Sequence, residues 1–265
     1  MSGRTLLAAL LAIGLIPASA SADPADCSAP RSISTIATSL ERSAGRIEAK
    51  QPLLIVTVGS SSTAGTGASG PDKTYPSQLQ AGLRQRFPSE DLTVLNRGKG
   101  GEDAGEELAR LDRDVVAAHP DLVIWQLGTN AVLRRDDLAA DEGMMERGVE
   151  ILRRDGIDVV LMDMQYAPRV LNRPAYPDMQ QLIANTAEHA DVGLYRRFDI
   201  MRYWQANDRF PNGMIAADGL HMTDASYACL GANLADALAA NWEAVAKSRP
   251  RPPAAPAAVA GLAPR

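Results

Sequence analysis

The chain has 265 residues, of which 46% are hydrophobic and 22% are charged, a balance that excludes collagen-like, disordered and membrane-bundle proteins. Its 27 Lys and Arg residues against 32 Asp and Glu residues give a formal charge of −5, so no basic excess is present to bind a nucleic-acid backbone. We expect a globular protein without a nucleic-acid partner.

Residues 1–22 have the pattern of a cleavable secretory signal. Arg4 precedes an unbroken apolar run over residues 6–16, and small residues follow as far as Ala22. An uncleaved anchor is the alternative, but this run is too short to cross about 30 Å of hydrocarbon as a helix. We therefore expect an exported protein, periplasmic or secreted, that does not insert stably into a membrane.

The sequence contains two cysteines, Cys27 just after this segment and Cys229 in the last predicted helix. In an oxidising compartment, two cysteines favour a disulfide, which here would join the mature N-terminus to the C-terminal helix. Two unpaired thiols are the alternative. A lipid anchor on Cys27 is disfavoured, because Asp26 stands where lipoprotein signals carry a small apolar residue.

Helical and strand patterns then alternate along the chain. Apolar residues recur at helical spacing over residues 33–47, and residues 53–58 form a continuous apolar and β-branched run typical of a buried parallel strand. Such alternation predicts a parallel, doubly wound sheet with helices on both faces. The later strands are predicted at 92–95, 122–127, 158–162 and 192–195, and the later helices at 79–87, 108–115, 138–154 and 177–189.

The last predicted helix covers residues 224–246. Leu230, Leu234, Leu238 and Trp242 recur every four residues and form a stripe that faces the core. Residues 249–265 are rich in Pro and Ala and predict a disordered tail. Because no internal repeat or linker interrupts the alternation, we expect one domain over residues 23–248.

Four loops at the predicted carboxyl ends of strands, or just before the last helix, carry unusual polar residues. Ligands bind beyond the carboxyl ends of the strands in open parallel sheets, so these loops are where chemistry is expected. Each loop alone is also consistent with ordinary turn or cap chemistry. The loops are residues 59–65 (Gly-Ser-Ser-Ser-Thr-Ala-Gly), 96–101 (Asn-Arg-Gly-Lys-Gly-Gly), 128–130 (Gly-Thr-Asn) and 218–221 (Asp-Gly-Leu-His).

In order and position, the loops resemble the sequence blocks of the SGNH hydrolases, also called the GDSL esterase and lipase family. The resemblance covers residues 53–242. It implies a three-layer α/β/α fold with a flavodoxin-like, five-stranded parallel sheet. Three consecutive serines leave the nucleophile undecided by spacing, and only the resemblance selects Ser61.

The resemblance also implies the roles of the other residues. His221 would take the proton of the Ser61 hydroxyl, and Asp218 would orient the imidazole. The backbone N–H groups of Ser61 and Gly101 and the side-chain amide of Asn130 would form the oxyanion hole. Water would then resolve the acyl-enzyme. Neither a metal ion nor an organic cofactor is required.

The chain departs from the family pattern at two positions. Ser60 replaces the aspartate of the first block, and Ala131 replaces the aspartate that follows the asparagine of the third block. Neither position carries the covalent chemistry. Side-chain hydrogen bonds that brace these loops in the family must therefore be made otherwise or omitted here.

Other motifs do not support a different class of site. Residues 65–70 satisfy a dinucleotide-binding string, but Gly65 lies six residues past Gly59, at which the predicted strand stops, and Pro71 interrupts the expected helix. The three histidines do not form a zinc-ligand cluster with other residues. Gln165 and Tyr166 follow the fourth predicted strand and are candidates for lining the pocket, although a structural role at the loop end is equally consistent.

The sequence leaves three functions open. The first is hydrolysis of carboxylic esters, such as O-acyl groups of carbohydrates, lipid esters or small acyl esters, by the Ser61 triad. The second is acyl transfer through the same triad to a sugar hydroxyl. The third is a glycan-binding module without catalysis, which predicts that Ser61 does not react with a serine-directed reagent.

Overall fold

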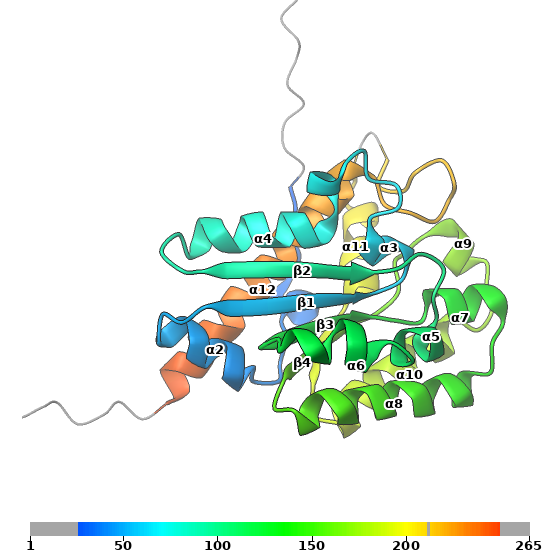
Figure 1. Cartoon of the computed structure of the whole chain (residues 1–265). Coiled ribbons are helices and arrows are strands. Elements are labelled where there is room, and N and C mark those ends of the chain that lie inside the picture. Colours follow the sequence, from blue (N-terminus) through cyan, green and yellow to red (C-terminus); the bar gives the residue numbers. More distant parts are fainter. Residues whose placement is uncertain (1–25, 211–212, 250–265) are drawn as a thin grey trace, which may run out of the picture.

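A computed structural model describes residues 26–210 and 213–249, and at its centre lies a five-stranded sheet with every strand pair parallel (Figure 1). The strand order is β2-β1-β3-β4-β5, which is the flavodoxin-like doubly wound order, so the predicted fold class is confirmed. The strands are β1 (Leu53–Gly59), β2 (Leu92–Gly98), β3 (Leu122–Gln126), β4 (Asp158–Met162) and β5 (Gly193–Tyr195).

Alternate residues of each central strand enter opposite cores, since side chains point to opposite faces of a sheet. Ile55 and Ile124 belong to one core, and Val56 and Trp125 to the other. The first core is covered by α2 (Glu41–Glu48), α4 (Tyr75–Arg86), α11 (Arg197–Ala206) and α12 (Asp224–Ser248), and the second by α5 (Ala104–Leu108), α6 (Leu111–Asp114), α8 (Leu138–Arg154) and α10 (Tyr176–His189).

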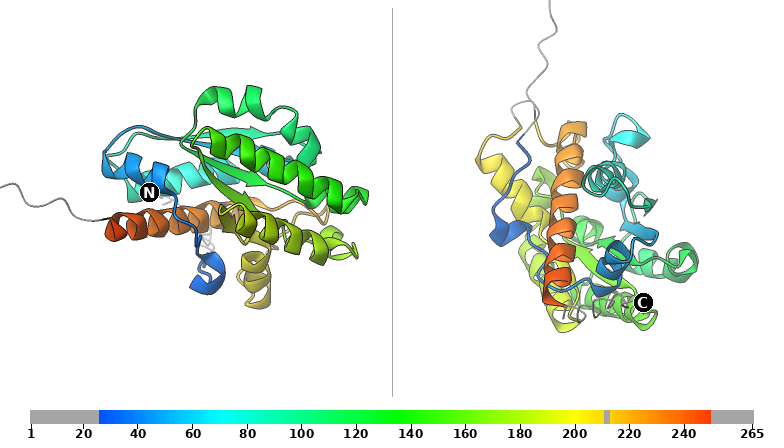
Figure 2. Two further views of the ribbon diagram at one scale, coloured as in Figure 1. Left: turned by 90° about the horizontal axis from the view of Figure 1, so that it is seen from below. Right: turned by 90° about the vertical axis from the view of Figure 1, so that its left-hand side faces the viewer.

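Several short helices complete the three layers. They are α1 (Arg31–Ser34), α3 (Ser61–Ala64), α7 (Thr129–Arg134), α9 (Pro168–Leu171), η1 (Pro71–Lys73) and η2 (Val116–Ala118). The 25-residue α12, drawn orange to red, runs along one side of the molecule and carries the predicted apolar stripe (Figure 2). Within the described ranges, no helix is long and apolar enough to cross a membrane.

The prediction of a single helix over residues 33–47 is wrong. The chain forms α1 and α2 with a non-helical segment between them, because α12 supplies hydrogen bonds that replace the helical ones. The Asn241 side chain donates to the carbonyls of Ile36 and Thr38 (both 2.9 Å) and accepts from the N–H of Leu40 (3.1 Å). Ile36 and Leu40 remain in the core, so the apolar spacing reflected burial and not a continuous helix.

The helix predicted over residues 108–115 is also interrupted. The first helix, α5, begins at Ala104, before the predicted start, because a capping box fixes its N-terminus. In this box the Asp103 side chain accepts from the Glu106 N–H, and the Glu106 side chain accepts from the Asp103 N–H. A second helix, α6, then follows.

The two ends of the domain are held to the core. Cys27 and Cys229 form a disulfide that joins the N-terminal segment to α12. Arg249, the first residue of the predicted disordered tail, instead forms ion pairs with Glu41 (2.9 Å) and Glu48 (2.6 Å) of α2, so the domain extends at least to this residue. The predicted signal segment, 1–22, and the rest of the predicted tail, 250–265, lie outside the described residues.

The substitution Asp141→Asn is expected to stabilise the protein above pH 6. Asp141 is 5% exposed, and one of its carboxylate oxygens has no hydrogen-bond partner in the described structure. Burial, followed by the charges of nearby Asp136 and Asp103, raises the pKa of Asp141 to about 6. Because this value exceeds the ordinary pKa of 3.8, the carboxyl favours folding most at low pH, and this contribution is lost as the pH rises through 6.

Urea denaturation at pH 4 and pH 8 measures the effect. At pH 8 the variant should gain on the order of 2 kcal/mol in free energy of unfolding over the wild type. At pH 4 the two proteins should nearly coincide. An equal gain at both pH values would show that the charge of Asp141 is not its cause.

Candidate active site

The candidate nucleophile lies at a sharp turn between β1 and α3, at the carboxyl end of the strand (Figure 1). Ser61 is the first residue of α3 and is partly exposed, whereas Ser60 and Ser62 on either side are buried. The turn is fixed by Gln126, the last residue of β3. Its side-chain carbonyl accepts from the Ser60 N–H (3.1 Å) and from the hydroxyls of Ser60 (3.1 Å), Ser62 (2.9 Å) and Thr63 (3.1 Å).

The loop before α12 brings the candidate base to this serine. His221 Nε2 lies 2.7 Å from Ser61 Oγ, and His221 Nδ1 lies 2.5 Å from Asp218 Oδ2. The loop also packs closely on the segment after α3, because a Cβ at Gly67 would lie 3.0 Å from the His221 Cβ and 2.6 Å from the Met222 carbonyl. The three residues implied by the resemblance are thus in hydrogen-bonding contact, although 160 residues separate the serine from the histidine.

Asp218 is held as a carboxylate that can orient the imidazole. Burial acts to raise the pKa of Asp218, but hydrogen bonds from the His221 ring and from the N–H groups of His221 and Leu220 outweigh it and lower the pKa to about 2. The backbone bonds are 3.0 Å and 2.9 Å long. The aspartate is therefore charged over the whole range in which a histidine can act as a base.

The loop after β2 lies against the nucleophile turn. A Cβ at Gly98 would lie 2.2 Å from the Ala64 nitrogen, so only glycine permits this approach. The Asn96 side chain donates to the Thr63 carbonyl of α3 at 2.8 Å. A Cβ at Gly100 would lie 3.9 Å from the Ser61 Cβ, so Gly100 lies next to the nucleophile. Gly101 is the following residue of the same loop.

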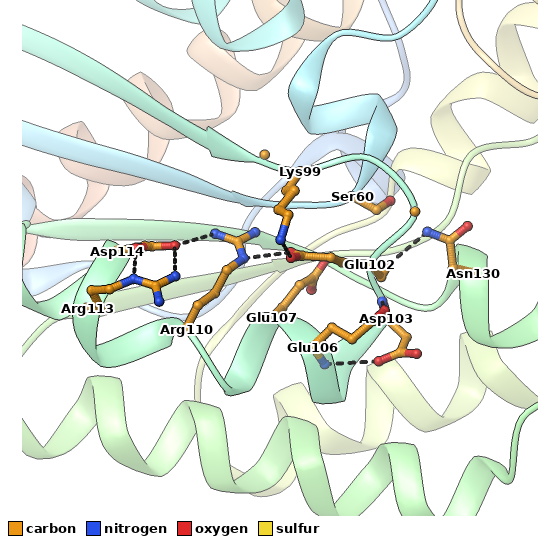
Figure 3. A network of polar contacts seen from close by, with 12 residues as sticks. Ser60, Lys99, Glu102, Asp103, Glu106, Glu107, Arg110, Arg113, Asp114 and Asn130 are labelled. Atoms are coloured by element: carbon orange, nitrogen blue, oxygen red, sulfur yellow. Dashed lines mark hydrogen bonds and ion pairs between the residues drawn. The ribbon is translucent and has the colours of Figure 1, made fainter.

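Ion pairs brace the far side of this loop (Figure 3). Buried Glu102 pairs with Arg110 (2.6 Å) and with Lys99 (3.0 Å), and Arg110 also contacts Asp114 at 3.5 Å. A cavity of about 460 Å³ borders the loop. Its lining is strongly polar and consists of Lys99, Gly100, Gly101, Glu102, Glu106, Ala109, Arg110, Arg113 and Arg134.

Helix α7 holds the same loop from the other side through two successive carbonyls. The Asn130 side-chain amide donates to the Glu102 carbonyl at 2.7 Å, as Figure 3 shows, and Arg134 donates to the Gly101 carbonyl. An amide NH₂ carries two protons, so one proton of Asn130 is free of this bond. Gly101 and Asn130 therefore lie at one loop next to the nucleophile turn.

The structure contradicts a pocket-lining position for Gln165. Its side chain is only 1% exposed and connects the Thr129 hydroxyl (2.9 Å) to the Leu220 carbonyl (3.5 Å). Tyr166 is partly exposed and packs edge-on against Phe198, with ring centroids 5.1 Å apart. Tyr166 remains a candidate for lining the site.

The two departures from the family pattern have local explanations. Ser60 takes part in the Gln126 hydrogen bonds of the nucleophile turn. Ala131 is 2% exposed and packs in the second core, so no polar brace extends from that position. Among the described residues, no group of three or more His, Cys, Asp or Glu side chains is placed to hold a metal ion.

Sequence reasoning missed Gln126, Arg134 and Arg197, which support the site without belonging to a recognised motif. Gln126 is a polar residue at the end of an otherwise apolar strand, and this position could have indicated a role in the site. Arg134 follows Asn130 by one helical turn, a spacing that places both on one side of α7. Nothing in the local pattern separates Arg197 from the exposed Arg196 beside it.

Comparisons with known proteins identify the family and the fold of this chain. Residues 26–244 match the model of the non-GDSL lipase-like family. An arylesterase of Vibrio mimicus is 31% identical over 124 residues, which are 46% of this chain and 60% of that protein. The chain thus spans little more than half the length of this relative.

Solved structures share the fold. A two-domain esterase active on acetylated mannans, crystallised with mannopentaose, gives a TM-score of 0.64 at 24% identity, covering 83% of this chain and 58% of that one. TesA gives a TM-score of 0.60 at 24% identity, covering 71% of this chain and 99% of that one. At these identities the likeness concerns the three-layer fold.

Proposed function

The chain belongs to the non-GDSL lipase-like family, and from this premise we propose that it is an exported serine esterase of the SGNH type. The observation that carries the proposal is the hydrogen-bonded series from Ser61 Oγ through His221 to Asp218. A serine hydroxyl is a weak nucleophile unless a base lies within hydrogen-bonding distance and a third group orients that base. Both conditions are met where the loop before α12 reaches the start of α3.

Acylation begins when Ser61 Oγ attacks the ester carbonyl carbon and gives its proton to His221 Nε2. The carbonyl oxygen becomes an oxyanion that accepts hydrogen bonds from the Ser61 and Gly101 N–H groups and from Asn130. The intermediate then collapses: the bond to the alcohol oxygen breaks, and His221 protonates the leaving alcohol. Asp218 stabilises the imidazolium throughout these steps.

Deacylation repeats the sequence with water as the nucleophile. His221 takes a proton from water, the hydroxide oxygen bonds to the acyl carbon, and the same donors hold the oxyanion. The bond to Ser61 then breaks, and Ser61 regains its proton from His221. The products are the carboxylic acid and the starting enzyme.

We propose a small acyl group, such as acetyl, on a carbohydrate as the substrate. The charged cavity beside Gly100 and Gly101 supports the carbohydrate part of this proposal, because its polar lining offers hydrogen-bond partners to sugar hydroxyls. The two-domain esterase that shares the fold is active on acetylated mannans, which is consistent with such a substrate.

Hydrolysis of p-nitrophenyl acetate, butyrate and octanoate by the purified protein tests the activity. We expect turnover that falls with acyl length, acetate release from acetylated oligosaccharides, and one adduct by intact mass after a serine-directed phosphonate. Turnover only with an added sugar acceptor would indicate an acyltransferase. Neither turnover nor adduct, in folded protein, would indicate a binding module.

Replacing Asn130 by alanine is expected to lower kcat about 10²- to 10³-fold, because one oxyanion donor is lost. The Glu102 carbonyl loses its partner in this variant as well, so Arg134→Ala, which frees the neighbouring Gly101 carbonyl, is the matched control. Steady-state kinetics should show a much smaller loss for the control. A loss confined to KM in the Asn130 variant would exclude the oxyanion role.

Export rests on the sequence pattern of residues 1–22 and is consistent with the disulfide, which requires an oxidising compartment. N-terminal sequencing of protein recovered from the periplasm or medium should give Asp23 as the first residue. Protein found only in the cytoplasm, with Met1 retained, would exclude export.

A further inference from the structure

Arg197, the first residue of α11, is fully buried, and the proposed mechanism does not use it. Its guanidinium donates three hydrogen bonds. Nε binds the Asp163 carbonyl (2.9 Å), Nη1 binds the Ser62 hydroxyl (2.9 Å) and Nη2 binds the Gln165 side-chain carbonyl (3.0 Å). Ser62 lies in α3, which follows β1, and Asp163 and Gln165 lie in the loop that follows β4.

Two of these bonds lead to residues next to the candidate catalytic groups. Ser62 directly follows the nucleophile. The Gln165 oxygen also accepts from the Thr129 hydroxyl (2.9 Å), and Thr129 directly precedes the oxyanion asparagine. The Gln165 amide donates to the Leu220 carbonyl (3.5 Å), which directly precedes the catalytic histidine. One guanidinium thus connects, directly or through one amide, the neighbours of three functional residues.

The hydrogen bonds of Arg197 alone do not require a positive charge at this position, although the buried Asp163 carboxyl nearby favours one. The three acceptors are a carbonyl, a hydroxyl and an amide oxygen, all of them neutral. Burial lowers the pKa of Arg197 because a cation is stabilised less in the protein interior than in water. Replacing a whole buried ion pair by apolar residues of similar volume is often neutral or stabilising, so the charge of Arg197 is by itself weak evidence for a role in stability. The rigid, planar fork of donors is what an apolar side chain cannot supply.

We infer that Arg197 is a positioning residue, which through Ser62 and Gln165 fixes the nucleophile turn, the oxyanion helix and the histidine loop relative to one another. The inference rests on the proposed function, since the geometry it maintains is that of the Ser61 site. A catalytic group misplaced by about 1 Å can cost about 100-fold in rate, so such a brace has a measurable effect on kcat.

A double-mutant cycle tests the connection while leaving Arg197 in place. Ser62→Ala removes one end of the path, and Thr129→Val removes the other without changing side-chain shape. We expect each single variant to lower kcat about tenfold or more, with KM within about twofold. The fold-loss in kcat of the double variant should be smaller than the product of the two single fold-losses. Once one substitution has broken the hydrogen-bonded path, the second substitution has little further effect on the positions of the catalytic groups.

Two results would overturn the inference. Single losses that multiply in the double variant would show two independent local defects, and kcat unchanged in both single variants would show a purely structural network. Thr186→Val is the matched control, because the Thr186 hydroxyl is equally buried, lies in α10 and has no hydrogen-bond partner among the described residues. This control should retain wild-type kcat.

A second readout separates this inference from the proposed function. Because His221 Nδ1 lies 2.5 Å from Asp218 Oδ2, we expect the proton between them to give a low-field ¹H resonance in the resting protein, whether or not the protein hydrolyses esters. We expect this resonance to shift or broaden in Thr129→Val and to stay unchanged in Thr186→Val. A wild type that forms no phosphonate adduct would defeat the proposed function, whereas an unchanged resonance in Thr129→Val would defeat the positioning role.

Discussion

Replacing Ser61 by alanine should lower kcat about 10³-fold or more and abolish the phosphonate adduct, with the fold retained. Alanine lacks the Oγ that lies 2.7 Å from His221 Nε2, so the variant loses the nucleophile and with it the acyl-enzyme route. Residual hydrolysis would come from the oxyanion donors and from substrate binding. Steady-state kinetics, intact mass and thermal unfolding on the same preparation measure the three parts of this prediction.

The neighbouring serines provide the control for this experiment. Ser60 is buried, and its hydroxyl is directed to Gln126 and not to His221, so Ser60→Ala should keep a phosphonate adduct on Ser61. Peptide mapping of the wild-type adduct locates the reactive residue. An adduct on Ser60 or Ser62, or wild-type turnover by Ser61→Ala, would assign the nucleophile to another serine.

His221→Ala is expected to lower kcat by a similar factor, about 10³-fold or more, because Ser61 then has no base to take its proton. The members of a triad act as a unit. Adding His221→Ala to Ser61→Ala should therefore reduce kcat little further, and the double variant should match the poorer single variant. Kinetics with p-nitrophenyl acetate on the three proteins measure this.

His189→Ala is the matched control for the loss of an imidazole. His189 lies exposed at the end of α10, outside the contacts of the candidate site, so its replacement should leave kcat and KM unchanged. Full activity in His221→Ala, or separate losses that multiply in the double variant, would contradict a shared role for Ser61 and His221.

Much of the fold follows from local sequence. The strand at residues 158–162 and the helix at 138–154 have the bounds that the sequence predicts, because each is a run whose periodicity agrees with its burial. The strand predicted at 92–95 extends instead to Gly98. Asn96, Arg97 and Gly98 are poor strand formers, and they are held in the sheet by their register with Thr57, Val58 and Gly59 of β1.

The helix α11 is an element that the sequence analysis did not predict at all. Residues 197–206 form a regular helix that the sequence pattern does not predict, since its buried residues contact both cores and its pattern is not that of one apolar face. Phe198 packs in the second core, whereas Ile200 and Trp204 pack in the first. A periodicity argument assumes one buried face, and a helix that passes the edge of the sheet has two.

The candidate site divides in the same way. The candidates Ser61, Gly101, Asn130, Asp218 and His221 come from short motifs together with their resemblance to the family, and only that resemblance selects Ser61 among three serines. The hydrogen bonds that hold these turns together come from Gln126, Gln165 and Arg197, whose partners are distant in sequence. By itself, the sequence determined the order of the five strands and, through the family resemblance, the candidate residues of the site. Only the tertiary structure decided which buried polar groups brace it, because a side chain's partner depends on how distant segments pack and not on its neighbours in the chain.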